Sequence, residues 1–380
     1  MKILYIWFKE PGGIPDGGIL ANTRNFYLMQ DIFGKDNVDV LYVHKKDERI
    51  SLLKKIQYLY NFFNGLHNGI TKDFIKEVLS VAPKYQFIFL SSSLFGIIAK
   101  ELKEAHYQGT IISHFHNVES IYYDAYISRW IPGRQIIINC AKKNDRWSCK
   151  FADIRIALNK RDKDILEKLY NCKIDYILPI SLTDKFYEEP HNNNTQTAKR
   201  PLCTFIGSNF GPNREGIIWF IKNVLPHVDI KLRIVGKHMN KLKKKYEVKD
   251  KVEIFSDVQD LSHYYLDSDF MIFPIFKGSG MKVKTCESLM YGKNIIGTKE
   301  SFEGYDIDIT KVGALCNSKK DFINSIKKYS KLPINKFNSY SRDVYLRKYS
   351  YEATLKKAKG IFLGLISRKK PNYNNQEVIS

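Results

Sequence analysis

The sequence lacks several features that define whole classes of protein. No apolar run approaches the ~18 residues of a membrane-spanning helix, and the apolar stretch after Met1 is too short for a secretory signal. The six cysteines show neither Cys-x-x-Cys nor zinc-ligand spacing. We therefore interpret them as reduced, mostly buried thiols. These absences argue against an integral membrane protein and a disulfide-stabilised secreted domain, and we expect a cytoplasmic protein.

Acidic residues are also scarce relative to basic ones. The chain has 61 Lys and Arg against 40 Asp and Glu, a formal net charge of +21. Such an excess predicts a polyanionic partner, or it reflects a lysine-rich composition alone. No zinc-finger, RNA-recognition or basic-zipper signature is present, so we expect no nucleic-acid partner. An anionic membrane surface is the expected partner instead.

The stretch over residues 270–304 carries the densest pattern in the chain. The uncharged run Phe270–Phe276 predicts a strand buried on both faces of a parallel sheet. A glycine turn at residues 278–280 follows, and the pattern then predicts a helix over Met281–Tyr291. A strand, a glycine turn and a helix start present free backbone N–H groups and a positive dipole end at one point. That arrangement favours an anion such as phosphate.

Three charged side chains lie on this predicted helix or at its start. Lys282 and Lys284 add positive charge near the turn, and Glu287 can accept hydrogen bonds from sugar hydroxyls one turn further along. An ordinary strand-to-helix turn with solvated lysines has the same pattern. The residues alone leave both interpretations open.

This segment resembles the nucleotide-sugar segment of GT-B glycosyltransferases, specifically glycosyltransferase family four, the group 1 transferases. Glu287 matches the second glutamate of that family's Glu–seven residues–Glu signature, which the resemblance implies binds the donor ribose. The first glutamate is absent, and Ser279 stands in its place, which leaves the donor sugar open. The resemblance also implies that Gly280, Met281 and Lys282 bind the donor through their backbone, together with Lys284.

The N-terminal part predicts a strand over Lys2–Trp7, a glycine-rich loop from Phe8 to Gly18, and a helix over Ile19–Phe33. The loop does not follow G-x-G-x-x-G, so a dinucleotide site is poorly supported. The family's first loop carries Gly-Gly near the donor phosphates, and Gly17-Gly18 is the best match. A plain flexible loop is nearly as good an interpretation.

A predicted strand at residues 110–115 ends with His114 and His116. A His-x-His pair resembles two metal ligands, but no third ligand lies nearby in the sequence, so we do not expect a metal. In the resembled family a histidine at this strand end lies against the donor sugar, and His116 is the match. The resemblance implies a catalytic role for His116; a histidine that only caps the strand remains the alternative.

A second α/β unit begins with a predicted strand at residues 202–206 and a turn at Gly207-Ser208-Asn209. We expect Asn213, next to Pro212, to cap the following helix. The resemblance assigns donor contacts to Ser208 and Asn213, to Gly236 at the end of the next strand, and to the loop with Asp257 and Val258 that cups the base.

Metal-binding motifs are weak. Two Asp-x-Asp triplets, at residues 267–269 and 306–308, match a metal motif of GT-A enzymes, but neither has the expected position relative to a strand. We expect no metal and no cofactor.

Two doubly wound, Rossmann-like parallel-sheet domains facing each other across a cleft are predicted, because strands and helices alternate throughout. We expect an acceptor-binding domain at residues 1–183 and a polar linker at 184–200. A nucleotide-sugar-binding domain at 201–345, a helix at 346–366 returning to the first domain and a basic tail at 367–380 follow. We expect Asp153 and Asp162 to be helix caps. The amphipathic helix over residues 52–63 suits packing on the domain better than a membrane interface, although both remain open.

The predicted function is a metal-independent, retaining glycosyltransferase that moves a hexosyl or related sugar from a nucleoside-diphosphate sugar to a glycan acceptor. The basic surface suggests a lipid-linked acceptor and a peripheral position at the inner face of the cell membrane. Capsule, exopolysaccharide or cell-wall synthesis would fit. The alternatives are a nucleotide-sugar epimerase of the same fold, and a non-catalytic transferase-like subunit that binds glycan or a partner enzyme.

Overall fold

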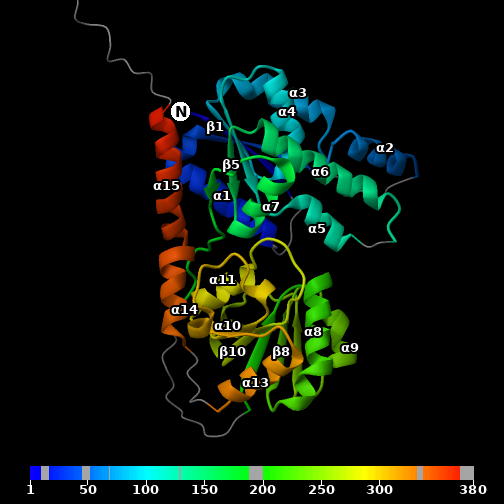
Figure 1. Ribbon diagram of the computed structural model, residues 1–380, viewed down its shortest axis with the longest axis vertical. Helices are drawn as coiled ribbons and strands as arrows, with labels where there is room; N and C mark the ends of the chain where they lie inside the picture. Colours follow the sequence, from blue (N-terminus) through cyan, green and yellow to red (C-terminus); the bar gives the residue numbers. More distant parts are fainter. Residues whose placement is uncertain are drawn as a thin grey trace, which may run out of the picture.

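The computed structural model describes residues 1–9, 17–44, 52–67, 69–127, 130–187, 200–331 and 337–368. Over these residues the chain forms two α/β domains stacked along the long axis of the molecule (Figure 1). Each domain contains one six-stranded sheet in which all paired strands run parallel. The predicted fold class, two doubly wound domains, is confirmed.

The N-terminal sheet has the strand order β2-β1-β3-β4-β5-β6. Its strands are β1 (Ile3–Lys9), β2 (Val38–His44), β3 (Phe87–Leu90), β4 (Thr110–Phe115), β5 (Ile154–Ala157) and β6 (Tyr176–Ile177). The helices of this domain are α1 (Gly17–Phe33), α2 (Leu52–Phe63), α3 (Lys72–Val81), α4 (Gly96–Glu104), α5 (Glu119–Tyr126), α6 (Arg134–Phe151) and α7 (Lys160–Tyr170).

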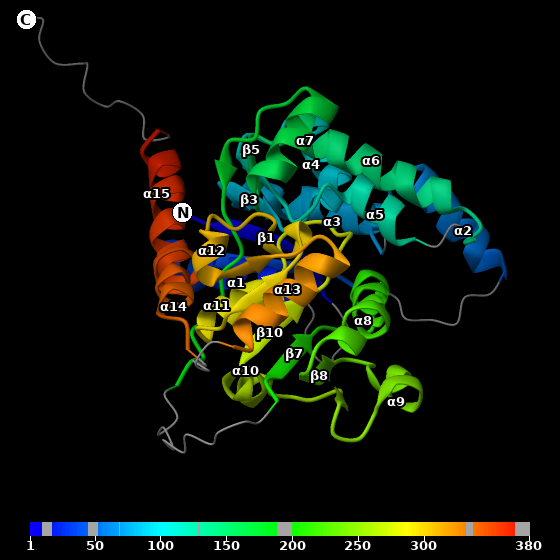
Figure 2. The ribbon, with the colours of Figure 1, turned by 60° about the horizontal axis from the view of Figure 1, so that its bottom comes forward.

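The C-terminal sheet has the strand order β12-β11-β10-β7-β8-β9, the order of a dinucleotide-binding Rossmann sheet. Figure 2 shows its neighbouring strands β10, β7 and β8. Its strands are β7 (Leu202–Ile206), β8 (Lys231–Gly236), β9 (Val252–Ser256), β10 (Phe270–Phe273), β11 (Ile295–Gly297) and β12 (Gly313–Leu315). Its helices are α8 (Gly211–Asn223), α9 (Asn240–Tyr246), α10 (Ser262–Asp267), α11 (Val283–Met290), α12 (Ile309–Val312) and α13 (Lys319–Tyr329).

Alternation along each N-terminal strand supplies two hydrophobic layers, one on each face of the sheet. In β1, Leu4 and Ile6 join a core with side chains of α3 and α4, whereas Ile3 and Tyr5 join a core with α1. Because a hydrophobic layer covers each face of the sheet, the central strands are continuous apolar runs. Every residue of β3, and of β10 in the other sheet, is buried.

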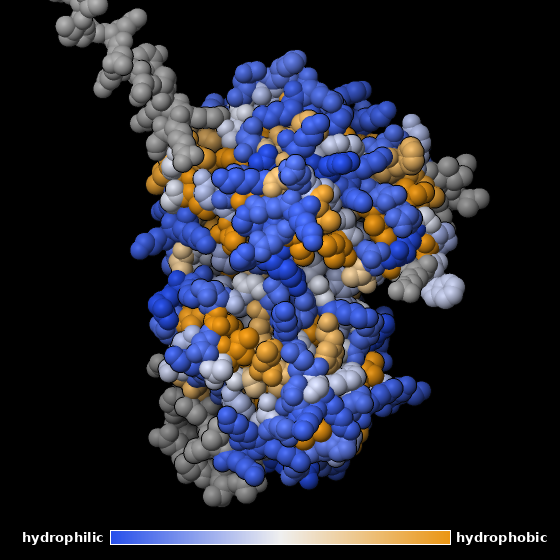
Figure 3. All heavy atoms as spheres, viewed as in Figure 1, coloured by the Kyte–Doolittle hydropathy of each residue, from blue (hydrophilic) through white to orange (hydrophobic). Residues whose placement is uncertain are grey.

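The face of the molecule drawn in Figure 3 is mostly hydrophilic, with scattered apolar patches. Within the described ranges, no helix combines the length and the apolar character needed to cross a bilayer.

The chain passes between the domains twice, side by side. Leu182 N–H donates to Tyr349 O (3.1 Å), and Tyr351 N–H donates to Leu182 O (3.0 Å). The second passage is a π-helical turn, Tyr345–Tyr349, between α14 (Ser339–Val344) and α15 (Tyr351–Arg368). These paired passages form the hinge region between the domains.

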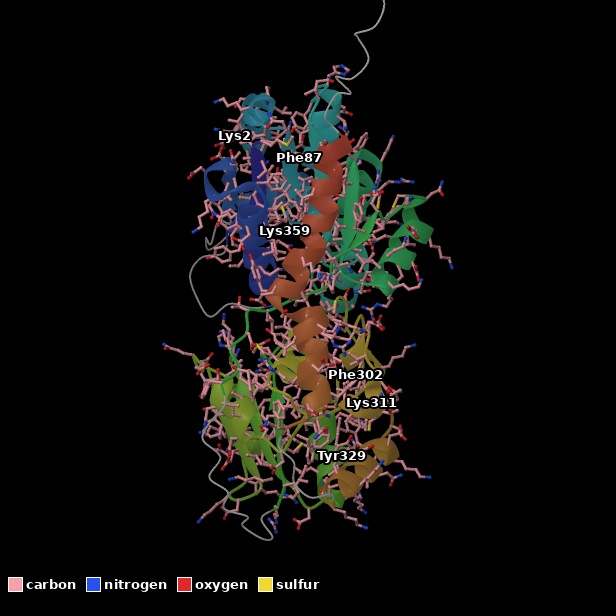
Figure 4. The ribbon with its side chains drawn as sticks, turned by 90° about the vertical axis from the view of Figure 1, so that its left-hand side faces the viewer. Lys2, Phe87, Phe302, Lys311, Tyr329 and Lys359 are labelled. Carbon is pink, nitrogen blue, oxygen red and sulfur yellow. The ribbon has the colours of Figure 1, made fainter. Side chains whose placement is uncertain are left out.

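Helix α15 lies on the N-terminal domain, although α14 packs on the C-terminal one (Figure 4). Ala358, Ile361 and Phe362 complete the same hydrophobic layer as Ile3 and Tyr5. Of the predicted linker, residues 184–187 and residue 200 are described. There Asp184 accepts two hydrogen bonds from the Arg342 guanidinium, which contributes to holding the pKa of that carboxyl below its usual value.

Several local predictions were wrong. Asp153 caps no helix; its carboxylate accepts from Ile111 N–H (2.8 Å) and joins β4 to the start of β5. The N-cap of α7 is Asn159, and Asp162 lies in the first turn. Helix α11 begins at Val283 rather than Met281. Gly280 has a positive φ of 60°, which is not helical, so the glycine turn extends further along the chain than predicted. Helix α1 already begins at Gly17, so Gly17-Gly18 is its first turn and not loop.

Candidate active site between the two domains

The strongest candidate site lies where β7 and β10 are neighbours in the C-terminal sheet. The connections from these two strands leave in opposite directions, which opens a crevice at their carboxyl ends. A cavity of about 350 Å³ occupies this position and extends to Tyr122 and Tyr126 on α5 of the other domain. We call it the Lys284 cavity.

Nine of the thirteen residues predicted as site residues line the Lys284 cavity: Ser208, Asn213, Gly236, Val258, Ser279, Met281, Lys282, Lys284 and Glu287. They lie at the ends of β7, β8, β9 and β10. These segments are far apart in the sequence, and the fold brings them together. His116, Gly18, Asp257 and Gly280 do not line it.

Lys284 has the most unusual environment in the cavity. Its ammonium donates to Asn213 Oδ1 (2.6 Å) and lies 4.9 Å from the centre of the Phe205 ring. No carboxylate of the described residues lies within ion-pair distance of it. Burial, and next the neighbouring charge of Lys282, lower the pKa of Lys284 to about 7. A cation in this setting lacks a counter-ion, which a bound anion would supply.

Asn213 therefore has a different role from the predicted one. The N-cap of α8 is Phe210, whose side chain caps nothing, and Pro212 occupies the first turn. The Asn213 side chain instead donates to Ser208 O (3.0 Å) and accepts from Lys284. It links the turn after β7 to the ammonium, so the two predicted donor segments meet at this residue.

Glu287 lies one turn deeper on α11. Its Oε2 accepts from the hydroxyl of buried Tyr265 at 2.6 Å. Burial raises the pKa of Glu287, while the Tyr265 hydrogen bond opposes the shift. Its other oxygen is left for a ligand hydroxyl.

The glycine turn after β10 touches the other domain. A Cβ on Gly280 would lie 2.6 Å from Asn117 Oδ1 and 2.9 Å from His116 O, so only glycine fits at this contact. Tyr126, also in the N-terminal domain, lines the same cavity as Ser279. The turn is therefore held between the two domains.

His116 lies at the end of β4 with its ring orientation fixed. Its Nε2 contacts Ser91 O at 2.7 Å and Asn22 Oδ1 at 3.0 Å. A carbonyl can only accept, so Nε2 carries the proton and Nδ1 is the acceptor. Burial, and next the charge of Arg24, lower the pKa of His116 to about 4.

We expect His116 to stay neutral between pH 5 and pH 8. NMR of the histidine rings, with His116→Asn to assign the signal, should show no titration in that range. Because the folded pKa lies below the unfolded one, the unfolded state binds more protons between about pH 6.5 and pH 4, and folding stability falls as the pH drops through that window. The loss should be smaller in His116→Asn; an inflection of the His116 signal near pH 6.5 would contradict the assignment.

The two remaining predicted residues have local roles. Asp257 has a φ of 57°, and its Oδ1 accepts from His238 N–H at 3.0 Å, which shapes the loop that presents Val258 to the cavity. Gly18 lies in the first turn of α1, next to residues 10–16 of the predicted loop, which lie outside the described residues.

His114 is buried and shares a T-shaped ring contact with His116. Among the described residues no group of three or more His, Cys, Asp and Glu side chains is arranged to hold a metal ion.

Sequence reasoning missed the residues that the N-terminal domain contributes. The ring of Tyr126 contacts the ring of Phe210 in a tilted arrangement, with ring centres 5.0 Å apart, across the domain boundary. Arg161 on α7 donates to Glu300 Oε2 at 2.9 Å, again across the boundary. A tyrosine-rich helix after the His116 strand end was the one available signal for the first contact; nothing in the sequence indicates the second.

Comparison with known proteins places this architecture. Residues 200–331 match the family model described as "Glycosyl transferases group 1". No curated protein sequence matches the chain.

Solved structures match nearly the whole chain. Sucrose-phosphate synthase from Thermosynechococcus elongatus aligns with a TM-score of 0.68 and 13% identity over 97% of this chain and 100% of its own. HepE from Anabaena, in complex with UDP, aligns with a TM-score of 0.67 and 11% identity over 97% and 100%. WaaG, a glycosyltransferase involved in lipopolysaccharide biosynthesis, gives 0.63 and 13% over 95% and 100%.

The fold and the cleft define a two-domain protein of the GT-B class. The resemblance predicted from residues 270–304 is confirmed, since the matched family segment contains them. The family match and the shared fold together support a glycosyltransferase.

Proposed function

We propose that the protein transfers a hexosyl or related sugar from a nucleoside-diphosphate sugar to a glycan acceptor, without a metal ion. The observation that carries this proposal is the ammonium of Lys284, enclosed at the β7/β10 crevice with no carboxylate partner among the described residues. The diphosphate of a donor would supply the missing negative charge.

The leaving group would be stabilised by charge already in place. The N-terminus of α11 at Val283 and that of α8 at Gly211 border the same cavity as Lys284. Helix N-termini and a lysine favour the negative charge that develops on a departing diphosphate. This arrangement would take the position that a divalent cation has in metal-dependent transferases.

The donor nucleoside would extend from this point along Glu287 toward Val258. Glu287 would accept hydrogen bonds from ribose hydroxyls through the oxygen that Tyr265 leaves unused. HepE has been crystallised with UDP and with UDP-glucose, so uridine nucleotides are the first to test here.

We propose retention of the anomeric configuration. Glu287 is the one carboxylate among the described residues that line the Lys284 cavity, and it is tied to Tyr265. An inverting reaction calls for a carboxylate or histidine base on the acceptor side of the sugar. The pKa of His116, lowered to about 4, makes its Nδ1 a weak base, so His116 would orient the donor sugar rather than remove a proton.

A lipid-linked acceptor and a peripheral membrane position belong to the same proposal, in capsule, exopolysaccharide or cell-wall synthesis. Apolar side chains gather at the α2 and α5 end of the N-terminal domain (Figure 3). Tyr60 and Phe63 on α2 are 57% and 66% exposed, Trp130 before α6 is 92% exposed, and Lys143 lies over the Phe63 ring. Aromatic side chains next to lysines suit an anionic membrane interface.

The proposal is tested by a thermal-shift screen with UDP, GDP, dTDP and their common sugar conjugates. A ligand that binds only the folded state raises the melting temperature. We expect one nucleotide to stabilise the chain and Glu287→Ala to weaken its binding about 100-fold in calorimetry, as expected when hydrogen bonds to a carboxylate are lost.

Glu215→Ala, on the exposed side of α8, is the matched control and should bind the nucleotide like the unaltered chain. No shift with any nucleotide would contradict a transferase and favour a non-catalytic subunit. Turnover of donor to an epimer without acceptor would favour an epimerase.

A further inference from the structure

Lys282 does not use its charge as its neighbour Lys284 does. Its ammonium donates to Ser279 O and to Gly280 O, both at 3.1 Å, and pairs with Glu300 Oε1 at 2.6 Å. An ammonium has three N–H donors, so all three are satisfied within the protein. Lys282 thus links the carbonyl groups of the glycine turn to Glu300. Of these two lysines, only Lys284 has no carboxylate in contact with its ammonium among the described residues.

Glu300, which follows β11, joins Lys282 and the glycine turn to the other domain. While its Oε1 binds Lys282, its Oε2 accepts from Arg161 Nη1 on α7 at 2.9 Å. A Cβ on Gly278 would lie 2.5 Å from the same Oε1, so the carboxylate is in contact with the turn itself. One carboxylate therefore holds a cation from each domain.

The network is shielded from solvent. The side chains of Lys282, Glu300 and Arg161 are 13%, 15% and 26% exposed. Ion pairs this enclosed are costly to break from one side, because the remaining charges stay desolvated. Burial lowers the pKa of Lys282, and the charge of Glu300 acts against that shift.

We propose that Glu300 is a positioning residue for sugar transfer: it couples closure of the two domains, through Arg161, to the shape of the glycine turn, through Lys282. The inference rests on the proposed transferase function. Opening the cleft separates Arg161 from Glu300, while Lys282 and the turn stay with the C-terminal domain. Closure restores the pair and sets Gly280 against His116 and Asn117, where the donor sugar would lie.

Glu300 is the residue to alter, in Glu300→Gln, together with Arg161→Met and the double variant. The nucleotide binds the C-terminal domain, so its dissociation constant should change less than about 3-fold, whereas kcat should fall about 10- to 100-fold, as expected for a misplaced reacting group. The two losses should add only in part in the double variant, since both remove the Arg161–Glu300 pair, while Arg161→Met also removes the contact with Glu303 at 3.6 Å. Arg161→Lys, which keeps the charge, should recover part of kcat.

Asp164→Asn is the control, because the Asp164–Lys160 pair lies within α7 and both of its side chains are exposed. It should leave both constants unchanged. Equal losses in nucleotide affinity and kcat for Glu300→Gln, or fully additive losses, would overturn the coupling.

Small-angle X-ray scattering separates this inference from the proposed function. Glu300→Gln and Arg161→Met should enlarge the radius of gyration of the nucleotide-bound chain relative to Asp164→Asn. If the unaltered chain transfers no sugar, the proposed function fails, but the scattering still decides whether Glu300 holds the domains together. An unchanged radius in both variants would overturn the inference.

Discussion

Lys284→Met should abolish tight donor binding without weakening the apo protein. We expect the dissociation constant for the nucleotide to rise about 100-fold or more, the effect of losing a charge-assisted hydrogen bond to phosphate. The melting temperature without ligand should stay the same or rise, because methionine fills a similar volume and removes an enclosed cation that has no carboxylate partner. Calorimetry and thermal unfolding at pH 7 measure the two effects.

The pH dependence follows from the pKa of about 7 for Lys284. The folded pKa lies below the unfolded value, so the unfolded state binds more protons between about pH 7 and pH 10.5. This lysine therefore makes apo stability rise with pH across that window. The diphosphate needs the protonated form, so donor affinity should fall as the pH rises above 7. Both dependences should be lost in Lys284→Met.

Lys277→Met is the matched control for this experiment. Lys277 borders the same cavity but is exposed, and its ammonium is solvated without a ligand. Its loss should cost much less affinity than the loss of Lys284. Equal effects of the two substitutions would mean that general positive charge, rather than the enclosed ammonium, attracts the donor.

The sequence was sufficient for the fold because its strands are buried on both faces. The run from Phe270 to Phe273 has no charge, and every one of its residues is buried. Glycines then mark the ends of strands where the crevice opens, as at Gly207 and Gly236; a Cβ on Gly236 would lie 2.0 Å from Gly207 O. Local pattern and tertiary position agree at these points, so the turns that border the Lys284 cavity were predictable.

The side-chain contacts between distant segments of the chain were not predictable in the same way. Asn213 has the residue type and the position of a helix cap. Its side-chain oxygen instead accepts a hydrogen bond from the Lys284 ammonium, 71 residues later in the chain. Lys282 and Lys284 look equivalent in sequence, but Glu300 binds only the first. Which of these contacts forms depends on which polar groups the fold brings within hydrogen-bonding distance, and the local sequence does not record that.

Gly280→Ala should remove most of the transfer activity while the nucleotide still binds. The residue has a φ of 60°, which costs a non-glycine residue about 1 kcal/mol or more, and its Cβ would lie 2.9 Å from the main-chain oxygen of His116. A backbone oxygen cannot turn away, so the cleft would stay slightly open. We expect kcat to fall about 100-fold, the effect of an ångström-scale displacement at the reacting centre.

Two further variants separate closure from folding. Gly360→Ala on α15 is the control, because a Cβ there has nothing within 4 Å, and it should leave activity nearly unchanged. Asn117→Ala in the Gly280→Ala background removes the nearest clashing atom, at 2.6 Å, but leaves His116 O, so it should restore part of kcat and not all. If Gly280→Ala keeps full activity, close contact between the glycine turn and the His116 segment is not needed for transfer. The chemistry must then take place with the two domains further apart.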